Sequence, residues 1–164
     1  METTIDNVTD YIIQYLLADK NKYHLSPAKL HKLLYYVEAW SLGINDKPFF
    51  SEEVEFEAWV HGPTSIHIQK RFAKKQIFED IKIEEIISKD IRLNNNDEEF
   101  INYILDNYAG FNGYELEIMC INERPWKDAR VGCSRFEECH RKIDKSTMHK
   151  YYRKRYEELS ESRE

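Results

Sequence analysis

Residues 57–63, with the sequence Glu-Ala-Trp-Val-His-Gly-Pro, carry the side chains most suited to chemistry in this chain. The imidazole of His61 titrates near neutral pH and is a candidate general base. The same ring could instead satisfy free backbone groups where a strand ends and Gly62 turns the chain, and we favour this structural role. Trp59 is either a core residue or an exposed anchor for a partner, because large amphipathic rings dominate protein interfaces.

Other catalytic, metal-binding and nucleotide-binding patterns are missing from the sequence. Ser65 lies close to two histidines, but the Gly-x-Ser-x-Gly turn of a nucleophilic serine is absent. Cys133, Cys139 and His140 are spaced wrongly for a zinc ribbon or finger. The five glycines are scattered and form no phosphate-binding loop. We therefore expect no catalytic residue, no metal and no cofactor.

The composition of the 164 residues is that of one ordinary globular domain, with 41% apolar and 33% charged side chains. No stretch reaches the roughly 20 apolar residues that a membrane helix needs, and the first residues do not resemble a signal peptide. The three cysteines cannot all pair within one chain and indicate reduced thiols. We expect a cytoplasmic protein that does not contact a membrane.

Charge is distributed unevenly along the chain. Residues 1–123 carry 12 basic and 22 acidic side chains, and residues 124–164 carry 12 basic and 8 acidic ones, which gives −10 and +4. Residues 150–156 interleave basic and aromatic side chains, as platforms that stack nucleic-acid bases do. However, the tyrosines there also form an ordinary helical core stripe, and a net charge of −6 repels a phosphate backbone. We do not expect a nucleic-acid partner.

The spacing of apolar residues predicts a mainly α fold, a single helical domain with one small β element. A first helix covers residues 5–16, with Thr4 or Asp6 as its cap. Ser26-Pro27 starts a second helix, in which leucines, Val37 and Trp40 form a stripe at 3.6-residue spacing and which Gly43 ends. Residues 53–60 alternate between apolar and acidic residues, which predicts a short strand with one solvated face that Gly62-Pro63 stops.

The rest of the chain is predicted as helices joined by turns. A helix capped by Thr64 or Ser65 runs to about Lys75, and residues 76–96 fit either a strand pair or a helix. Asp97 caps a helix that Gly110 ends. Further helices follow Asn112-Gly113 and Pro125. The last helix starts near Asp144 or Ser146 and buries a set of mostly aromatic residues: Met148, Tyr151, Tyr152, Tyr156 and Leu159.

Three segments together resemble a known family. They are residues 30–40 (LHKLLYYVEAW), residues 56–63 (FEAWVHGP) followed by Arg71-Phe72, and residues 122–130 (NERPWKDAR). Their order and intervals resemble the Panacea domain, also called the SocA-like antitoxin domain, which is found in many phage and prophage proteins. The resemblance implies one Panacea-like domain over residues 1–164, with a core at about 8–156 and a short charged C-terminal tail.

The resemblance also implies a function. It points to a cytoplasmic antitoxin that neutralises its toxin by direct protein contact, and one branch of the family is similar to a protease adaptor that delivers the toxin for degradation. Two alternatives stay open: a phage-encoded inhibitor or adaptor that binds a host enzyme, and an enzyme that uses His61. The resemblance fixes neither the identity of the protein partner nor the oligomeric state.

The motif residues are expected to meet in one cluster, which is either a stiff core or a groove. The second helix would present its polar motif residues beside the leucine stripe, the strand end would approach them, and Trp126 would cover the pocket. Binding selectivity is expected on outer elements, including residues 76–96 and the last helix. The candidate partner-binding residues are His31, Tyr35, Glu38, Trp59, His61, Gly62, Pro63, Trp126, Asp128 and Arg130.

Overall fold

Helix α2 (Pro27–Asn45) is the centre of the fold, and every one of its residues from Pro27 to Gly43 is buried. The computed structural model describes residues 2–19 and 22–163. These residues form seven α-helices, a 3₁₀ turn and a two-stranded antiparallel sheet, which confirms the predicted mainly α fold with a small β element. Around α2 lie, in chain order, α1 (Ile5–Leu17), β1 (Glu57–Trp59), β2 (Gly62–Thr64), α3 (Ile66–Arg71), η1 (Ile83–Glu85), α4 (Asn95–Tyr108), α5 (Gly113–Ile121), α6 (Arg124–Ala129) and α7 (Lys145–Glu161).

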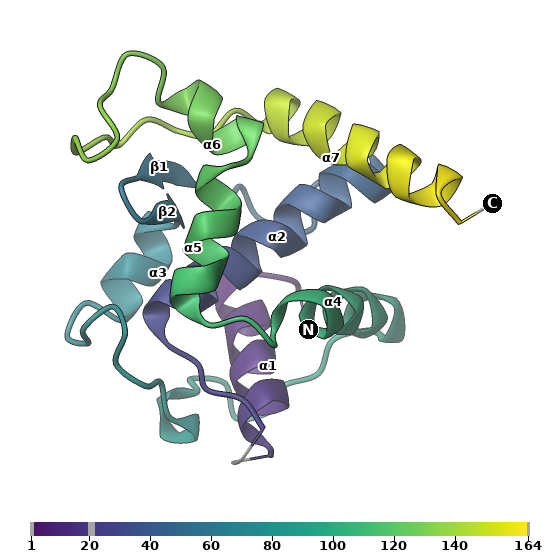
Figure 1. Cartoon of the computed structure of the whole chain (residues 1–164). Helices are drawn as coiled ribbons and strands as arrows, with labels where there is room; N and C mark the ends of the chain where they lie inside the picture. Colours follow the sequence, from purple (N-terminus) through teal and green to yellow (C-terminus); the bar gives the residue numbers. More distant parts are fainter. Residues whose placement is uncertain (1, 20–21, 164) are drawn as a thin grey trace.

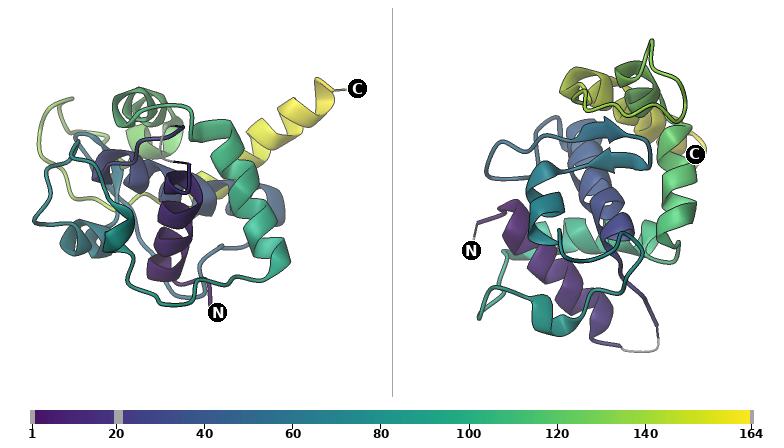
Figure 2. Two further views of the ribbon diagram at one scale, coloured as in Figure 1. Left: turned by 90° about the horizontal axis from the view of Figure 1, so that it is seen from below. Right: turned by 90° about the vertical axis from the view of Figure 1, so that its left-hand side faces the viewer.

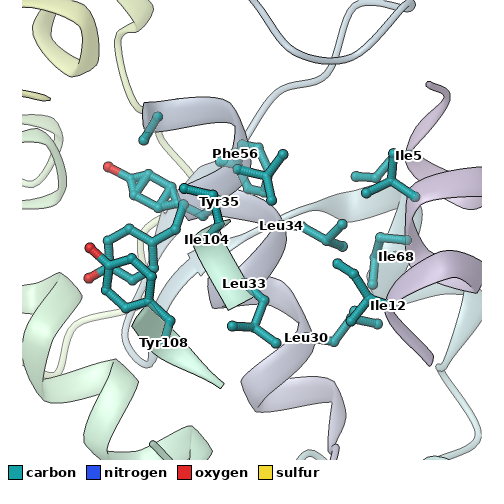
Figure 3. Close-up of a cluster of buried hydrophobic side chains, with 14 of the residues drawn as sticks. Ile5, Ile12, Leu30, Leu33, Leu34, Tyr35, Phe56, Ile68, Ile104 and Tyr108 are labelled. Atoms are coloured by element: carbon teal, nitrogen blue, oxygen red, sulfur yellow. The ribbon is translucent and has the colours of Figure 1, made fainter. Parts of the chain in front are cut away.

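Helix α2 is enclosed by α1, α4, α5, α7 and the β-hairpin (Figure 1). Figure 2 shows the same arrangement from two further sides, with the last turns of α7 projecting from the body. The side chains from α1, α2, α3 and α4 that meet around α2 form one apolar core (Figure 3). Each fully buried large apolar side chain stabilises the fold by about 1.5–3 kcal/mol. The leucine stripe is therefore one side of a helix that is buried on all sides.

Most helices begin where a polar side chain accepts a hydrogen bond from a free backbone N–H, as predicted. Thr4 caps α1, Ser26 caps α2, and Ser65 caps α3. One predicted cap is wrong: α4 begins two residues before Asp97, because the side chain of Asn94 accepts from the Asp97 N–H at 2.9 Å.

Gly43 does not end α2, contrary to the prediction. The helix continues to Asn45, and the chain leaves it at Asp46 in a left-handed conformation with φ 58°. A Cβ atom at Gly43 would lie 2.6 Å from the Cβ of Tyr152 and 2.7 Å from its backbone carbon. Gly43 is therefore the point at which α7 crosses α2 at closest range, which helical spacing within α2 does not reveal.

The predicted strand at residues 53–60 is one arm of a hairpin, and its paired part is shorter than expected. Glu57 pairs with Thr64 and Trp59 with Gly62, so Gly62-Pro63 begins a second strand instead of stopping the first. The turn needs Gly62, whose φ is +107°. The predicted alternation holds from Val54 to Ala58, since Val54, Phe56 and Ala58 are buried while the residues between them are more exposed, and it ends before Val60, which is half-buried.

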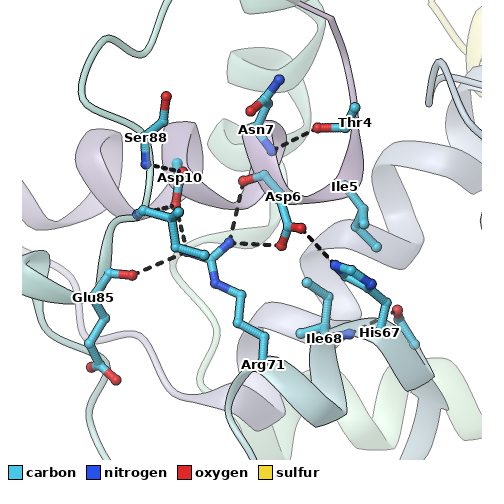
Figure 4. A network of polar contacts seen from close by, with 12 residues as sticks. Thr4, Ile5, Asp6, Asn7, Asp10, His67, Ile68, Arg71, Glu85 and Ser88 are labelled. Carbon is cyan, nitrogen blue, oxygen red and sulfur yellow. Dashed lines mark hydrogen bonds and ion pairs between the residues drawn. The ribbon is translucent and has the colours of Figure 1, made fainter.

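Residues 76–94 form neither a strand pair nor an α-helix, and Asn95 and Asn96 belong to α4. Residues 76–94 run as an irregular segment with the single turn η1, and α3 ends at Arg71 instead of near Lys75. A polar network attaches this segment to α1 (Figure 4). Buried Asp10 accepts hydrogen bonds from the Arg71 guanidinium at 2.5 Å and from the Ser88 N–H at 2.9 Å, and Arg71 also donates to the Glu85 carbonyl at 3.1 Å. Side chains distant in sequence thus fix a backbone that has no regular structure of its own.

Along residues 2–19 and 22–163, every helix is too short or too polar to cross a membrane.

Candidate functional site

The β-hairpin and α6 are joined through two motif side chains. The indole N–H of Trp126 donates to the Trp59 carbonyl at 2.8 Å, and the Arg130 guanidinium donates to the Ala58 carbonyl at 2.7 Å. Trp126 and Arg130 are both buried, whereas Trp59 is half-buried. The second and third motif segments are therefore parts of one structural unit.

Arg130 also organises the irregular chain between α6 and α7. Its second terminal nitrogen donates to the carbonyls of Ser134 at 2.9 Å and Glu137 at 2.5 Å. Its guanidinium lies 4.9 Å from the ring centroid of Trp126, which is cation–π geometry. A planar group with five donors is suited to holding several carbonyls at once, and this requirement explains an arginine at the position.

His61 stands at the turn of the hairpin with its side chain 59% exposed. Its Nδ1 lies 3.0 Å from a carboxylate oxygen of Glu117 on α5. The indole N–H of Trp59 donates to Glu57 at 2.8 Å, and the Trp59 ring meets the ring of His140 edge-on at 4.9 Å. His61 is thus an oriented, accessible imidazole beside a half-buried aromatic ring.

The three motif residues of α2 point into the protein interior. The Nδ1 of His31 accepts from the Ser65 N–H at 3.2 Å. Burial, with a smaller contribution from the charge of Lys32, lowers the pKa of His31 to about 3. Burial also raises the pKa of Tyr35, whose ring packs edge-on against Phe56 at 5.6 Å.

Glu38 and Asp128 lie away from the hairpin. Glu38 accepts from the Phe49 N–H at 2.6 Å and pairs with Lys145 at 2.6 Å, so it joins α2 to the start of α7. Asp128 is exposed and pairs with Arg124 at 3.5 Å along α6. Of the ten candidates, seven gather in and around the hairpin, namely His31, Trp59, His61, Gly62, Pro63, Trp126 and Arg130; Tyr35, Glu38 and Asp128 do not.

A cavity of about 230 Å³ opens between α2, the hairpin, α3 and the segment before α7. His31, Trp59 and His61 line it together with residues that were not among the ten candidates, including Lys32, Phe72 and His140. Trp126 is not in its lining and does not cover it, contrary to the expectation. Lys32 stands inside the first motif segment, but its burial follows only from the enclosure of α2.

Glu123 is a second residue that was missed, although it belongs to the third motif segment. Its carboxylate accepts from the hydroxyls of Tyr36 on α2 and Tyr152 on α7 and pairs with Arg155 at 3.1 Å. Burial raises the pKa of Glu123 despite these partners. The first and third motif segments therefore meet at a buried carboxylate, whose only sequence signal is an acidic residue next to the Arg-Pro-Trp run.

Two potential nucleophiles, Ser65 and Cys120, are unsuited to reaction with His61 as a base. The hydroxyl of Ser65 is occupied as the α3 cap, and burial raises the pKa of the Cys120 thiol, which opposes the thiolate that a nucleophile requires. In the part of the chain that the structure describes, no three histidine, cysteine or acidic side chains are grouped to hold a metal ion.

The comparison with protein families gives one match. The family described as Antitoxin SocA-like, Panacea domain matches residues 30–127, which is more than half of the chain. The matched range runs from α2 into α6 and contains the hairpin and α5. Among curated proteins and among solved structures, nothing matches this chain.

Proposed function

The chain belongs to the SocA-like Panacea family of antitoxin domains, and from this premise we propose that it neutralises a cognate toxin by direct protein–protein contact. The observation that carries the proposal is the family match over residues 30–127. We further propose that the functional domain includes α1 and α7, which lie outside the match, because both pack against α2. In this proposal the protein acts in the cytoplasm as a binding protein and not as an enzyme.

The buried motif residues support this role as a frame for a binding surface. Arg130 fixes the hairpin and the chain after α6, and Glu123, at the start of α6, joins α2 and α7. A rigid frame lowers the entropy that a surface loses when it binds a partner. We therefore assign the selectivity for the toxin to the outer segments that this frame holds.

Two irregular segments carry exposed apolar side chains suited to partner contact. In residues 76–87, Phe78 is 55% exposed and Ile87 is 66% exposed. In residues 131–136, Val131 is 71% exposed and Phe136 is 79% exposed. Apolar side chains displayed on irregular segments that polar networks hold in place are typical of protein-binding surfaces. The carbonyls that Arg130 contacts flank Phe136 directly, at Arg135 and Glu137.

Co-expression with the toxic product of a neighbouring gene tests the proposal. We expect the wild-type chain to restore growth and to co-purify with the toxin. Phe136→Ser and Ile87→Ser should weaken both effects, because each removes an exposed apolar contact without disturbing the core. Tyr114→Ser is the matched control, since Tyr114 is 60% exposed but lies on α5 outside both segments. Failure of the wild-type chain both to rescue growth and to form a complex would reject the function.

The same assay separates the finer alternatives. A protease adaptor would shorten the half-life of the toxin in cells, whereas a blocking antitoxin would leave the toxin stable in a complex. A phage-encoded inhibitor of a host enzyme would instead capture a host protein from lysate in the absence of any toxin. His61→Ala should keep full rescue, because we assign His61 no catalytic role, and a folded His61→Ala variant without activity would favour the enzymatic alternative.

A further inference from the structure

The cavity beside the hairpin is lined by two polar groups, both on buried side chains, that make no hydrogen bond within residues 2–19 and 22–163. They belong to His31 and Lys32, which are consecutive in α2 and both line the cavity. Buried donors are nearly always paired, so the unpaired His31 Nε2 requires an explanation, and a lysine without an ion pair stands beside it.

The hydrogen bond of His31 determines which of its nitrogens carries the proton. Nδ1 accepts from the Ser65 N–H at 3.2 Å, so Nδ1 is unprotonated. The ring is neutral at physiological pH, because burial lowers its pKa to about 3. A neutral imidazole has one N–H, which must therefore be on Nε2. Within residues 2–19 and 22–163, this buried Nε2 has no hydrogen-bond partner.

Lys32 is 2% exposed, and its ammonium group makes no hydrogen bond or ion pair with any described residue. Its stem lies against the hairpin, since a Cβ atom at Gly62 would be 3.0 Å from the Lys32 Cε. Burial lowers the pKa of Lys32, and the nearby Cys120 and Glu117 oppose this effect only in part, so an anion in the cavity would favour the charged form. A lysine buried without an ion pair destabilises a fold, so a structural role does not explain it. Its Nζ, unlike the His31 Nε2, is not among the fully enclosed polar atoms, and the side chain lines the cavity.

The other basic side chains in the cavity lining already contact carboxylates. Lys75 pairs with Glu79 and Glu85, both at 3.2 Å. His61 contacts Glu117 at 3.0 Å, and His140 contacts Glu138 at 2.8 Å. Among the described lining residues, Lys32 thus provides the unpaired cation, and the carboxylates close to the cavity oppose an anion of higher charge. A monovalent anion matches this balance better than a dianionic phosphate.

The remaining walls suit an apolar body attached to that anion. Trp59, Phe72 and Ile77 present two aromatic rings and a branched side chain to the same cavity. We propose that the cavity binds a monovalent carboxylate on an apolar or aromatic body, which accepts hydrogen bonds from the Lys32 ammonium and the His31 Nε2–H. The site goes beyond the proposed toxin neutralisation, which requires no cavity. The carboxylate could come from a free small acid or from the C-terminus of a protein chain, and its chemistry is the same in both cases.

Benzoate is the first probe, with uncharged benzamide and inorganic phosphate as comparisons, and calorimetric titration is the measurement. We expect benzoate to bind at least 10-fold tighter than either. The source of the carboxylate is tested with two acetylated peptides that end in Phe, one with a free C-terminus and one with an amide. Preference for the free-acid peptide over benzoate indicates a protein terminus, and the reverse preference indicates a small acid. Equal binding of benzoate and benzamide, or tighter binding of phosphate, overturns the proposal.

Lys32→Met tests the cation, because methionine keeps an apolar stem and removes the charge. We expect the affinity of this variant for benzoate to fall at least 10-fold. Without ligand, we expect the midpoint of its unfolding transition to rise, because a buried lysine without an ion pair is removed. Lys75→Met is the matched control in the same lining and should change affinity less than 2-fold. A lower midpoint of Lys32→Met with unchanged benzoate affinity would overturn the proposal. The NMR signal of the His31 Nε2–H in the wild-type chain provides a readout that needs no variant: benzoate should shift it, and an unmoved signal at saturation also overturns the proposal.

Discussion

Gly43→Ala is the substitution for which the fold and the local sequence predict opposite effects. In the interior of an isolated helix, alanine is more favourable than glycine by about 1 kcal/mol. Gly43 lies inside α2, two residues before its end. Helix propensity alone therefore predicts that the alanine variant is more stable than the wild type.

The crossing of α7 over α2 predicts the reverse. The new Cβ atom would lie 2.6 Å from the Tyr152 Cβ, 2.7 Å from the Tyr152 backbone carbon and 2.9 Å from the Arg153 nitrogen. These atoms cannot move by a change of rotamer, so α7 must shift as a body. Overpacking of this kind costs about 1–3 kcal/mol. A shift of α7 also strains the hydrogen bonds that Tyr152 and Arg155 donate to Glu123, each of which is worth about 1.5–3 kcal/mol.

The expected net loss is about 3 kcal/mol in the free energy of unfolding, after the gain in helix propensity is subtracted. For a domain of this size, such a loss lowers the melting temperature by roughly 6–12 °C. Urea unfolding followed by tryptophan fluorescence measures it, because Trp40 packs edge-on against Tyr152 at 5.0 Å.

Gly110→Ala is the matched control, since a Cβ atom there meets nothing within 4 Å and its φ is not positive. We expect no loss of stability in this control. A Gly43→Ala variant as stable as the wild type, or more stable, would refute the close crossing of α2 and α7.

Three further predictions concern the buried polar networks. Arg130→Met should lower the free energy of unfolding by about 2–4 kcal/mol, because several carbonyls lose their donor. The control Arg124→Met, at a side chain that is 73% exposed, should change it by less than about 0.5 kcal/mol. Urea unfolding compares the two variants, and equal effects would contradict the role of Arg130. Burial raises the pKa of Glu123 in the folded state above its unfolded value of about 4.3. The protonated carboxyl therefore contributes its full stability below about pH 4.3, and this contribution is lost as the pH rises through the folded-state pKa. The stability of the wild type relative to Glu123→Gln should therefore fall as the pH rises above about 4, and a constant difference would exclude a raised pKa. Asp10→Asn should speed amide hydrogen exchange in residues 85–88 by about 10-fold, and unchanged exchange at Ser88 would show that the carboxylate does not hold this segment.

Several features of the fold depend on neighbours in sequence and were predictable for that reason. A helix cap is made by a side chain and a backbone N–H three residues later, so Ser26 and Asn112 mark helix starts without knowledge of the rest of the fold. The alternation around Phe56 likewise reflects the geometry of a single strand. The three motif segments were sufficient to identify the family, which the match over residues 30–127 confirms.

Other features depend on contacts between residues far apart in the chain, and only the tertiary structure decided them. Gly43 was predicted to end a helix, but its lack of a side chain makes room for Tyr152, more than 100 residues away. Residues 76–96 gave an ambiguous pattern because no local periodicity determines their path. Hydrogen bonds to Asp10 and Arg71 hold this segment instead.

The sequence by itself established the helical class, most helix starts and the antitoxin family. The tertiary structure established that α2 is buried on all sides, and this enclosure removes His31 and Lys32 from water. An isolated helix would expose both side chains, so their burial cannot be read from the residues around them. The physical reason is that periodicity records which face of one helix is apolar, whereas burial depends on how many other elements cover that helix.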